Sequence, residues 1–246
     1  FCGRAVKQNA NGDISVPCQS TPASILPINF QRNGRKNVDT ATDSEIGQLR
    51  SVVGSLAWIC RQCRPELSYA VSRLQSMTTT ANVGVLTFAN KVLEEAKYSV
   101  SRGLTYPAGL LDWEKSILVT ISDASFASET RHENGRTMPR RSQKGRVTIL
   151  ADPNLWDRNG GRMYVLGWRS TMIRRVCRST FAAETQAMIS AVGEGEKIRA
   201  AIADMTSTTV NPIRHLWLTD CESLYSYLTN PVNNGTEDKR LEIDLE

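Results

Sequence analysis

Three acidic residues stand where a carboxylate could help to hold a metal ion. Glu184 lies three residues after Phe181 and four before Met188 in an expected amphipathic helix, so it shares their apolar face. A bare carboxylate on that face is costly unless something neutralises it. Asp123 and Asp220 each follow an apolar run. Convergent carboxylates of this kind suit a pair of Mg²⁺ ions, because hard cations prefer oxygen ligands.

Strands and one long helix are the elements that must position these acids. The helix is expected to open at about residue 179, where apolar residues begin to recur at steps of three, four or seven. A polar, basic stretch over 128–141 separates the first two expected strands. Short apolar runs predict four strands, at 116–122, 145–150, 163–168 and 215–219.

Short motifs surround the acids in a fixed order. The first is Ser122-Asp123-Ala124-Ser125-Phe126, and the second joins Trp168-Arg169-Ser170 to Ser179-Thr180-Phe181-Ala182-Ala183-Glu184. The last two are Asp220-Cys221-Glu222-Ser223-Leu224 and Glu242-Ile243-Asp244. This order resembles the ribonuclease H fold, and it is similar in particular to the ribonuclease H domain of copia-type LTR retrotransposon Pol polyproteins.

The resemblance implies an α/β fold class, with a ribonuclease H-like mixed sheet flanked by helices and a small helical thumb or connection unit before it. Residues 1–40 would be the end of a reverse transcriptase palm and hairpin, and 41–112 the thumb or connection region. Residues 113–246 would form the ribonuclease H-like domain, truncated at its C-terminal end.

The thumb or connection region is expected to contain three helices. Thr42-Asp43-Ser44-Glu45 is a capping box that opens the first, Pro65 opens the second, and the third spans about 83–98. The stretches 49–56 and 64–72 resemble the corresponding family motifs. Amphipathic helices also fit a plain hydrophobic core equally well.

The activity implied by the resemblance is hydrolysis of the RNA strand of an RNA–DNA hybrid. Asp123, Glu184, Asp220 and Asp244 would be both the catalytic residues and the ligands of two Mg²⁺ ions, with Mn²⁺ as a substitute. Glu242 is an alternative to Asp244. The resemblance also implies the upstream reverse transcriptase polymerase domain of the same polyprotein as a partner. The polymerase's own metal-binding aspartates are missing, so no polymerase activity is expected.

Basic residues are concentrated close to the acids. The net charge of the whole chain is +5. The segment 131–178 alone has twelve Arg or Lys against three acids, a net charge of +9, which suits a phosphate backbone. A solvated basic loop is the alternative. The candidates for nucleic-acid contact are Ser125, Arg169, Ser170, Arg174, Arg175 and Arg178.

Composition excludes some other classes of protein. No apolar run in the 246 residues approaches the length of a membrane span, so we expect a soluble intracellular protein, in the cytoplasm, a virus-like particle or the nucleus. The six cysteines include one Cys60-Arg61-Gln62-Cys63 motif. Zinc would need further ligands, and the chain has only two histidines, so reduced thiols at a helix end are expected.

Three hypotheses from different classes remain open at this point. The chain is an active ribonuclease H, a catalytically inactive or repurposed retroelement remnant that only binds nucleic acid, or an unrelated α/β protein. In the third case each acid has a structural role: Asp123 caps a turn, Asp220 caps the helix after it, and Glu184 pairs with an arginine.

Overall fold

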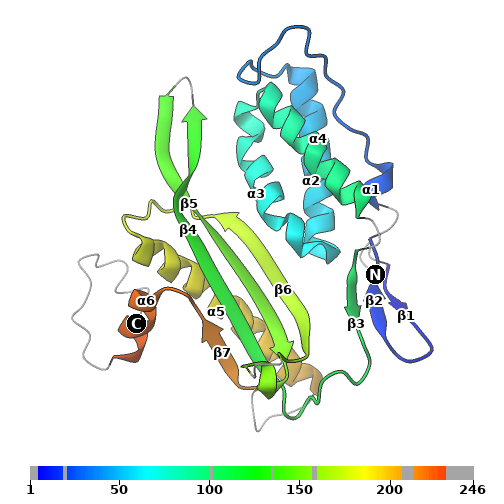
Figure 1. Ribbon diagram of the computed structural model, residues 1–246, viewed down its shortest axis with the longest axis vertical. Helices are drawn as coiled ribbons and strands as arrows, with labels where there is room; N and C mark the ends of the chain where they lie inside the picture. Colours follow the sequence, from blue (N-terminus) through cyan, green and yellow to red (C-terminus); the bar gives the residue numbers. More distant parts are fainter. Residues whose placement is uncertain are drawn as a thin grey trace. The chain divides into compact units, whose positions relative to one another are not determined.

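The structure, a computed structural model, describes residues 5–18, 21–99, 102–133, 136–156, 160–206 and 213–230. It is mixed α/β (Figure 1), and the chain divides into two compact units. The first contains Phe1–Ala108 together with Arg131–Met138, and the second contains Gly109–Thr130 together with Pro139–Glu246. The boundary expected after residue 112 lies close to Gly109, in the stretch that precedes the first long strand. No helix among the described residues is long and apolar enough to span a bilayer.

Three helices form the core of the first unit: α2 (Asp43–Cys63), α3 (Ser68–Met77) and α4 (Val83–Tyr98). Their buried faces are lined by leucine, valine and alanine side chains in one hydrophobic cluster. The shorter elements are β1 (Lys7–Gln8), β2 (Ile14–Val16), α1 (Thr21–Ser24), η1 (Pro65–Leu67), η2 (Thr78–Thr80) and β3 (Leu104–Tyr106). The three strands pair antiparallel in the order β1-β2-β3.

The capping box expected at the start of α2 is confirmed. The Thr42 hydroxyl accepts a hydrogen bond from the Glu45 amide at 3.3 Å, and Glu45 Oε2 accepts one from the Thr42 amide at 2.8 Å. Arg35 pairs with the same carboxylate at 2.7 Å. The hydrogen bonds from Arg35 and from the Thr42 amide lower the pKa of Glu45 to about 2. The helix therefore begins at a satisfied N-terminus.

A buried arginine joins the ends of α2 and α4. Arg64 is fully buried, and its guanidinium donates to the Ala96 carbonyl at 3.2 Å and to Ser99 Oγ at 2.6 Å. It also pairs with Glu66. Because the charge is paired and its donors are used, its burial is tolerated and fixes the junction between the helices.

A four-stranded mixed sheet forms the second unit, in the order β6-β5-β4-β7. β5 and β6 pair antiparallel, whereas β4 and β7 pair parallel, and the parallel pair requires a long crossover. That crossover contains helix α5. The elements are β4 (Ile117–Glu133), β5 (Arg136–Ala151), η3 (Pro153–Trp156), β6 (Met163–Met172), α5 (Thr180–Thr206), β7 (His215–Leu218) and α6 (Glu222–Thr229).

The polar stretch 128–141 belongs largely to strands. β4 continues to Glu133 and β5 starts at Arg136, so the two form a long ribbon where the sequence shows no apolar alternation. The reason is that backbone hydrogen bonds carry a two-stranded ladder past the point where a buried face is needed. Apolar periodicity detects only the part of a strand that lies on a core.

Helix α5 packs across one face of the sheet (Figure 1). Arg146 on β5 donates to the Ser190 carbonyl at 2.8 Å, and Lys144 donates to the Gln186 carbonyl at 3.4 Å. Most of the expected apolar stripe is at least partly buried, but Met205 is 76% exposed. Met205 lies in the last turn of the helix, so the periodic pattern continues beyond the residues that the sheet covers.

A polar network lies beneath α5. His215 on β7 has Nδ1 2.7 Å from Glu196 Oε1 and Nε2 2.9 Å from Thr120 Oγ1. Thr120 Oγ1 also lies 3.3 Å from Thr148 Oγ1. The network joins α5 to β4, β5 and β7, and Gly195 is the helix residue against which the imidazole lies.

Replacing this glycine should destabilise the protein. In Gly195→Ala the new Cβ would meet the His215 ring and come within 2.7 Å of Thr120 Oγ1. We expect the free energy of unfolding, measured by urea denaturation, to fall by about 1–3 kcal/mol because the site is overpacked.

The matched control is Gly193→Ala in the same helix, where an added Cβ meets nothing within 4 Å. Alanine is the better helix former, so this change should raise the free energy of unfolding by about 0.5–1 kcal/mol. Equal effects of the two substitutions would show that the imidazole does not press on α5.

Candidate metal centre

Parallel pairing of β4 with β7 brings two of the acids to the same level. The last paired residues are Ile121 and Leu218. Asp123, within β4, and Asp220, just after the end of β7, each lie two residues further along their own chain segments, and both are exposed. A parallel register therefore aligns two carboxylates whose positions in the sequence are far apart.

The third acid comes from the start of α5. Glu184 is only 4% exposed, and its Oε1 accepts a hydrogen bond from the Ala124 amide at 3.2 Å. Its Oε2 is buried and has no hydrogen-bond partner among the described residues. A buried carboxylate oxygen without a partner is costly, and a cation at this position would satisfy it.

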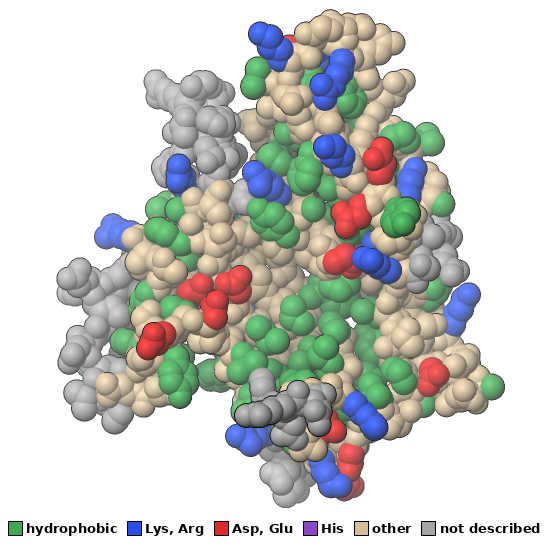
Figure 2. Space-filling model, viewed as in Figure 1, with side chains coloured by type: hydrophobic (Ala, Val, Ile, Leu, Met, Phe, Trp, Pro, Cys, Tyr) green, Lys and Arg blue, Asp and Glu red, His purple; other side chains and the backbone are tan. Residues whose placement is uncertain are grey.

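The three carboxylates converge. One oxygen from each of Asp123, Glu184 and Asp220 lies within 4.8 Å of the others. Figure 2 shows a group of acidic side chains on this face of the second unit, between the places that Figure 1 labels α6 and β4. Burial, and secondarily the charges of the two aspartates, raise the pKa of Glu184 to about 7 against the opposing effect of the Ala124 hydrogen bond.

These residues fit a hard divalent cation. Three carboxylates supply oxygen ligands, and two of them are open to solvent, so bound water and a substrate oxygen could complete the coordination of Mg²⁺ or Mn²⁺. The cation would also offset the burial and, secondarily, the aspartate charges that keep Glu184 partly protonated near neutral pH.

The structural roles considered for the acids fit less well. The N-cap of α6 is Cys221, so Asp220 lies one residue before the cap. Glu184 makes no ion pair with an arginine in the described part of the chain. Asp244 and its alternative Glu242, expected as the fourth ligand, lie outside the described residues.

The candidates for nucleic-acid contact lie on β4, on β6 and in the segment before α5. Arg174 and Arg178 are exposed in the segment that leads into α5, and Ser125 is exposed two residues after Asp123. Arg169 is exposed on β6, and the Ser170 hydroxyl accepts a hydrogen bond from Gln143 at 2.8 Å. Arg175 is also exposed in the segment before α5.

The net charge of the basic segment overstates the charge available to a ligand. The side chains of Lys144 and Arg146 donate hydrogen bonds to backbone carbonyls of α5, and Arg146 also pairs with Glu194 at 3.3 Å. Burial lowers the pKa of Lys144. Sequence reasoning missed this role, although the alternation of these two residues along one strand could have indicated a shared face.

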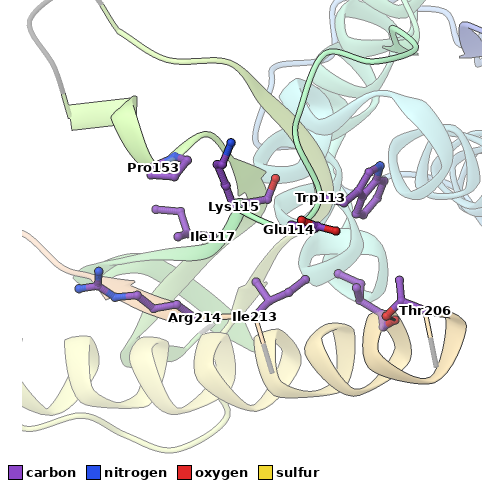
Figure 3. Close-up of a pocket in the computed structure, with 10 residues that line it drawn as sticks. Trp113, Glu114, Lys115, Ile117, Pro153, Thr206, Ile213 and Arg214 are labelled. Atoms are coloured by element: carbon purple, nitrogen blue, oxygen red, sulfur yellow. Dashed lines mark hydrogen bonds between the residues drawn. The ribbon is translucent and has the colours of Figure 1, made fainter. Parts of the chain in front are cut away.

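A large cavity lies at the opposite end of the sheet (Figure 3). It has a volume of about 800 Å³ and contains none of the expected site residues. Its lining includes Trp113, Ile202 and Arg214, and its one lysine, Lys115, pairs with Asp112 at 3.0 Å. The acids and this cavity are therefore separate features of the second unit.

Neither models of known protein families, nor curated proteins, nor solved structures match this chain.

The raised pKa of Glu184 predicts how stability depends on pH in the absence of metal. The pKa rises from its ordinary 4.5 to about 7, so between these values the unfolded chain loses a proton that the folded protein keeps. The free energy of unfolding should therefore fall as the pH rises through this window, by up to about 1.4 kcal/mol per pH unit. Urea denaturation in EDTA at several pH values would measure this slope.

Glu184→Gln should remove this part of the slope, because an amide does not titrate in this range. Glu222→Gln, a change at an exposed acid close by in α6, should leave it unchanged. A slope that is the same in wild type and Glu184→Gln would contradict the assigned pKa.

Proposed function

We propose that the second unit is a ribonuclease H-like domain that hydrolyses the RNA strand of an RNA–DNA hybrid with two Mg²⁺ ions. The observation that carries this proposal is the convergence of Asp123, Glu184 and Asp220 within 4.8 Å, with a buried carboxylate oxygen left unpaired. A cation bound by the three acids would satisfy this oxygen.

The order of the elements supports the same proposal. An aspartate on a strand, further strands, a glutamate on a helix and an aspartate after a parallel strand follow one another along the chain. This is the order in which the copia-type resemblance arranges its catalytic acids. The first unit would then correspond to the thumb or connection region, and the upstream polymerase domain would be its partner in the polyprotein.

The acids would act as ligands and need no side-chain nucleophile. Mg²⁺ ions held by Asp123, Glu184 and Asp220 would supply an activated water and stabilise the leaving 3′ oxygen. Glu184 must give up its proton to become a ligand, and its pKa of about 7 allows this near neutral pH. The Ala124 amide fixes one of its oxygens and leaves the other for the cation.

Recognition of the substrate would rest on backbone shape and charge. Arg174 and Arg178 carry exposed guanidinium groups beside the entry to α5, where bidentate hydrogen bonds to phosphate are favourable. The Ser170 hydroxyl accepts from Gln143 and so keeps its own proton to donate. Hydroxyl groups such as those of Ser125 and Ser170 can contact the 2′-hydroxyls that distinguish RNA from DNA.

Cleavage of a labelled RNA–DNA hybrid in the presence of Mg²⁺ tests the activity. Wild type should cut the RNA strand and leave double-stranded DNA intact. Asp123→Asn and Asp220→Asn should each lower the rate by more than roughly 100-fold, because each removes a metal ligand.

The matched control is Asp204→Asn, which changes an exposed acid outside the cluster and should keep the wild-type rate. Absence of cleavage by wild type would reject the catalytic proposal. If salt-sensitive binding of the hybrid persisted, the remaining function would be that of an inactive, nucleic-acid-binding remnant.

The basic segment before α5 generates a second test. Arg178→Ala should weaken hybrid binding and reduce the slope of log affinity against log salt by about 1, because one phosphate contact is lost. Arg214→Ala is the control, since Arg214 is also exposed but lines the cavity at the other end of the sheet. Fluorescence anisotropy at several salt concentrations would measure both, and equal effects would show that binding is not centred on the acid site.

A further inference from the structure

Two cysteines from distant parts of the sequence meet in the first unit. Cys18 follows β2, and Cys63 is the last residue of α2. Both are buried free thiols, and they share a small apolar cluster with Val16 and Ile59. The two thiols therefore lie together in this cluster, and the neighbouring Cys18 is one cause of the raised pKa of Cys63.

The contact selects a different pair from the one that the sequence motif suggests. In the Cys60-x-x-Cys63 motif, Cys60 Sγ lies 3.2 Å from Ser68 Oγ and belongs to the larger core cluster of the helices. Cys63 belongs to the other cluster, with Cys18. The spatial partner of Cys63 is therefore not its neighbour in the motif.

We propose that Cys18 and Cys63 are an oxidisable dithiol, which a small disulfide such as oxidised glutathione converts into an intrachain disulfide. Cys63 lines a cavity of about 590 Å³, through which such a molecule can approach. Arg102 lines the same cavity and offers a cation to the carboxylates of glutathione. This inference is independent of the proposed nuclease activity.

The reaction proceeds by two thiol–disulfide exchanges. The Cys63 thiolate attacks one sulfur of oxidised glutathione, which forms a mixed disulfide and releases one glutathione thiolate. The Cys18 thiolate then attacks the Cys63 sulfur, which forms the Cys18–Cys63 disulfide and releases the second glutathione thiolate. The protein dithiol is oxidised by two electrons, one oxidised glutathione is reduced to two glutathiones, and the two protons from the cysteines pass to the released thiolates.

The buried position sets the rate of the first exchange. Burial, and then the hydrogen bond with Cys18, raise the pKa of Cys63 to about 12. Because only the thiolate attacks, the dithiol stays reduced for long periods at neutral pH, and its oxidation should accelerate by about tenfold for each pH unit below that pKa.

Peptide mapping tests the proposal. The full chain is incubated with oxidised glutathione at pH 7 and pH 9, blocked with N-ethylmaleimide and digested without reduction. We expect a peptide pair cross-linked through Cys18 and Cys63, formed faster at pH 9, and a higher melting temperature for the oxidised protein because the cross-link restricts the unfolded chain.

Three variants distinguish the outcomes. Cys60→Ser should keep the cross-link, whereas Cys18→Ser and Cys63→Ser should each abolish it. Native circular dichroism of the variants verifies that they fold, and wild type oxidised in urea gives the pattern of a chain without selective pairing. A Cys60–Cys63 cross-link, stable mixed disulfides without resolution, or unreacted Cys18 and Cys63 at pH 9 would each overturn the proposal.

Discussion

The burial of one carboxylate is the constraint on which the second unit depends. Glu184 is held beneath the sheet edge by the packing of α5, with one oxygen bound to the Ala124 amide and the other unpaired. Two exposed aspartates increase the cost of ionising it. The fold therefore holds a buried carboxylate close to two other acids. A divalent cation is the kind of ligand that would offset both its burial and the repulsion between the three groups.

Much of the surrounding structure keeps α5 in the position that this arrangement needs. Arg146 and Lys144 donate to helix carbonyls from β5, and His215 joins Glu196 to Thr120 from β7. These contacts fix the helix against strands that carry the two aspartates. A basic segment can thus serve two purposes: some of its charges hold the scaffold, and those near the start of α5 remain exposed to a polyanion.

In the first unit, the buried charged groups are instead paired with partners inside the protein. The buried Arg64 is paired with two helix-end acceptors and with Glu66, and Glu45 is paired with Arg35 and with the Thr42 amide. Burial keeps the Cys63 thiol protonated at neutral pH. The buried charged side chains Arg64 and Glu45 thus have partners within the protein, whereas the buried carboxylate of Glu184 keeps one oxygen unpaired beside two other acids, where a cation would satisfy it.

The sequence by itself determined the local elements and singled out the three acids that converge in the structure. Helical periodicity predicted α2, α4 and α5, and the capping box predicted where α2 begins. Glu184 was singled out because it is an acid on the apolar face of α5. These features depend on neighbours within one or two turns, so the sequence contains them. Only the tertiary structure decided that Asp123 and Asp220 share a level, that β4 and β5 extend through a polar stretch, and that Cys63 meets Cys18. Strand register and contacts between distant segments arise from the packing of the whole unit, which no local pattern records.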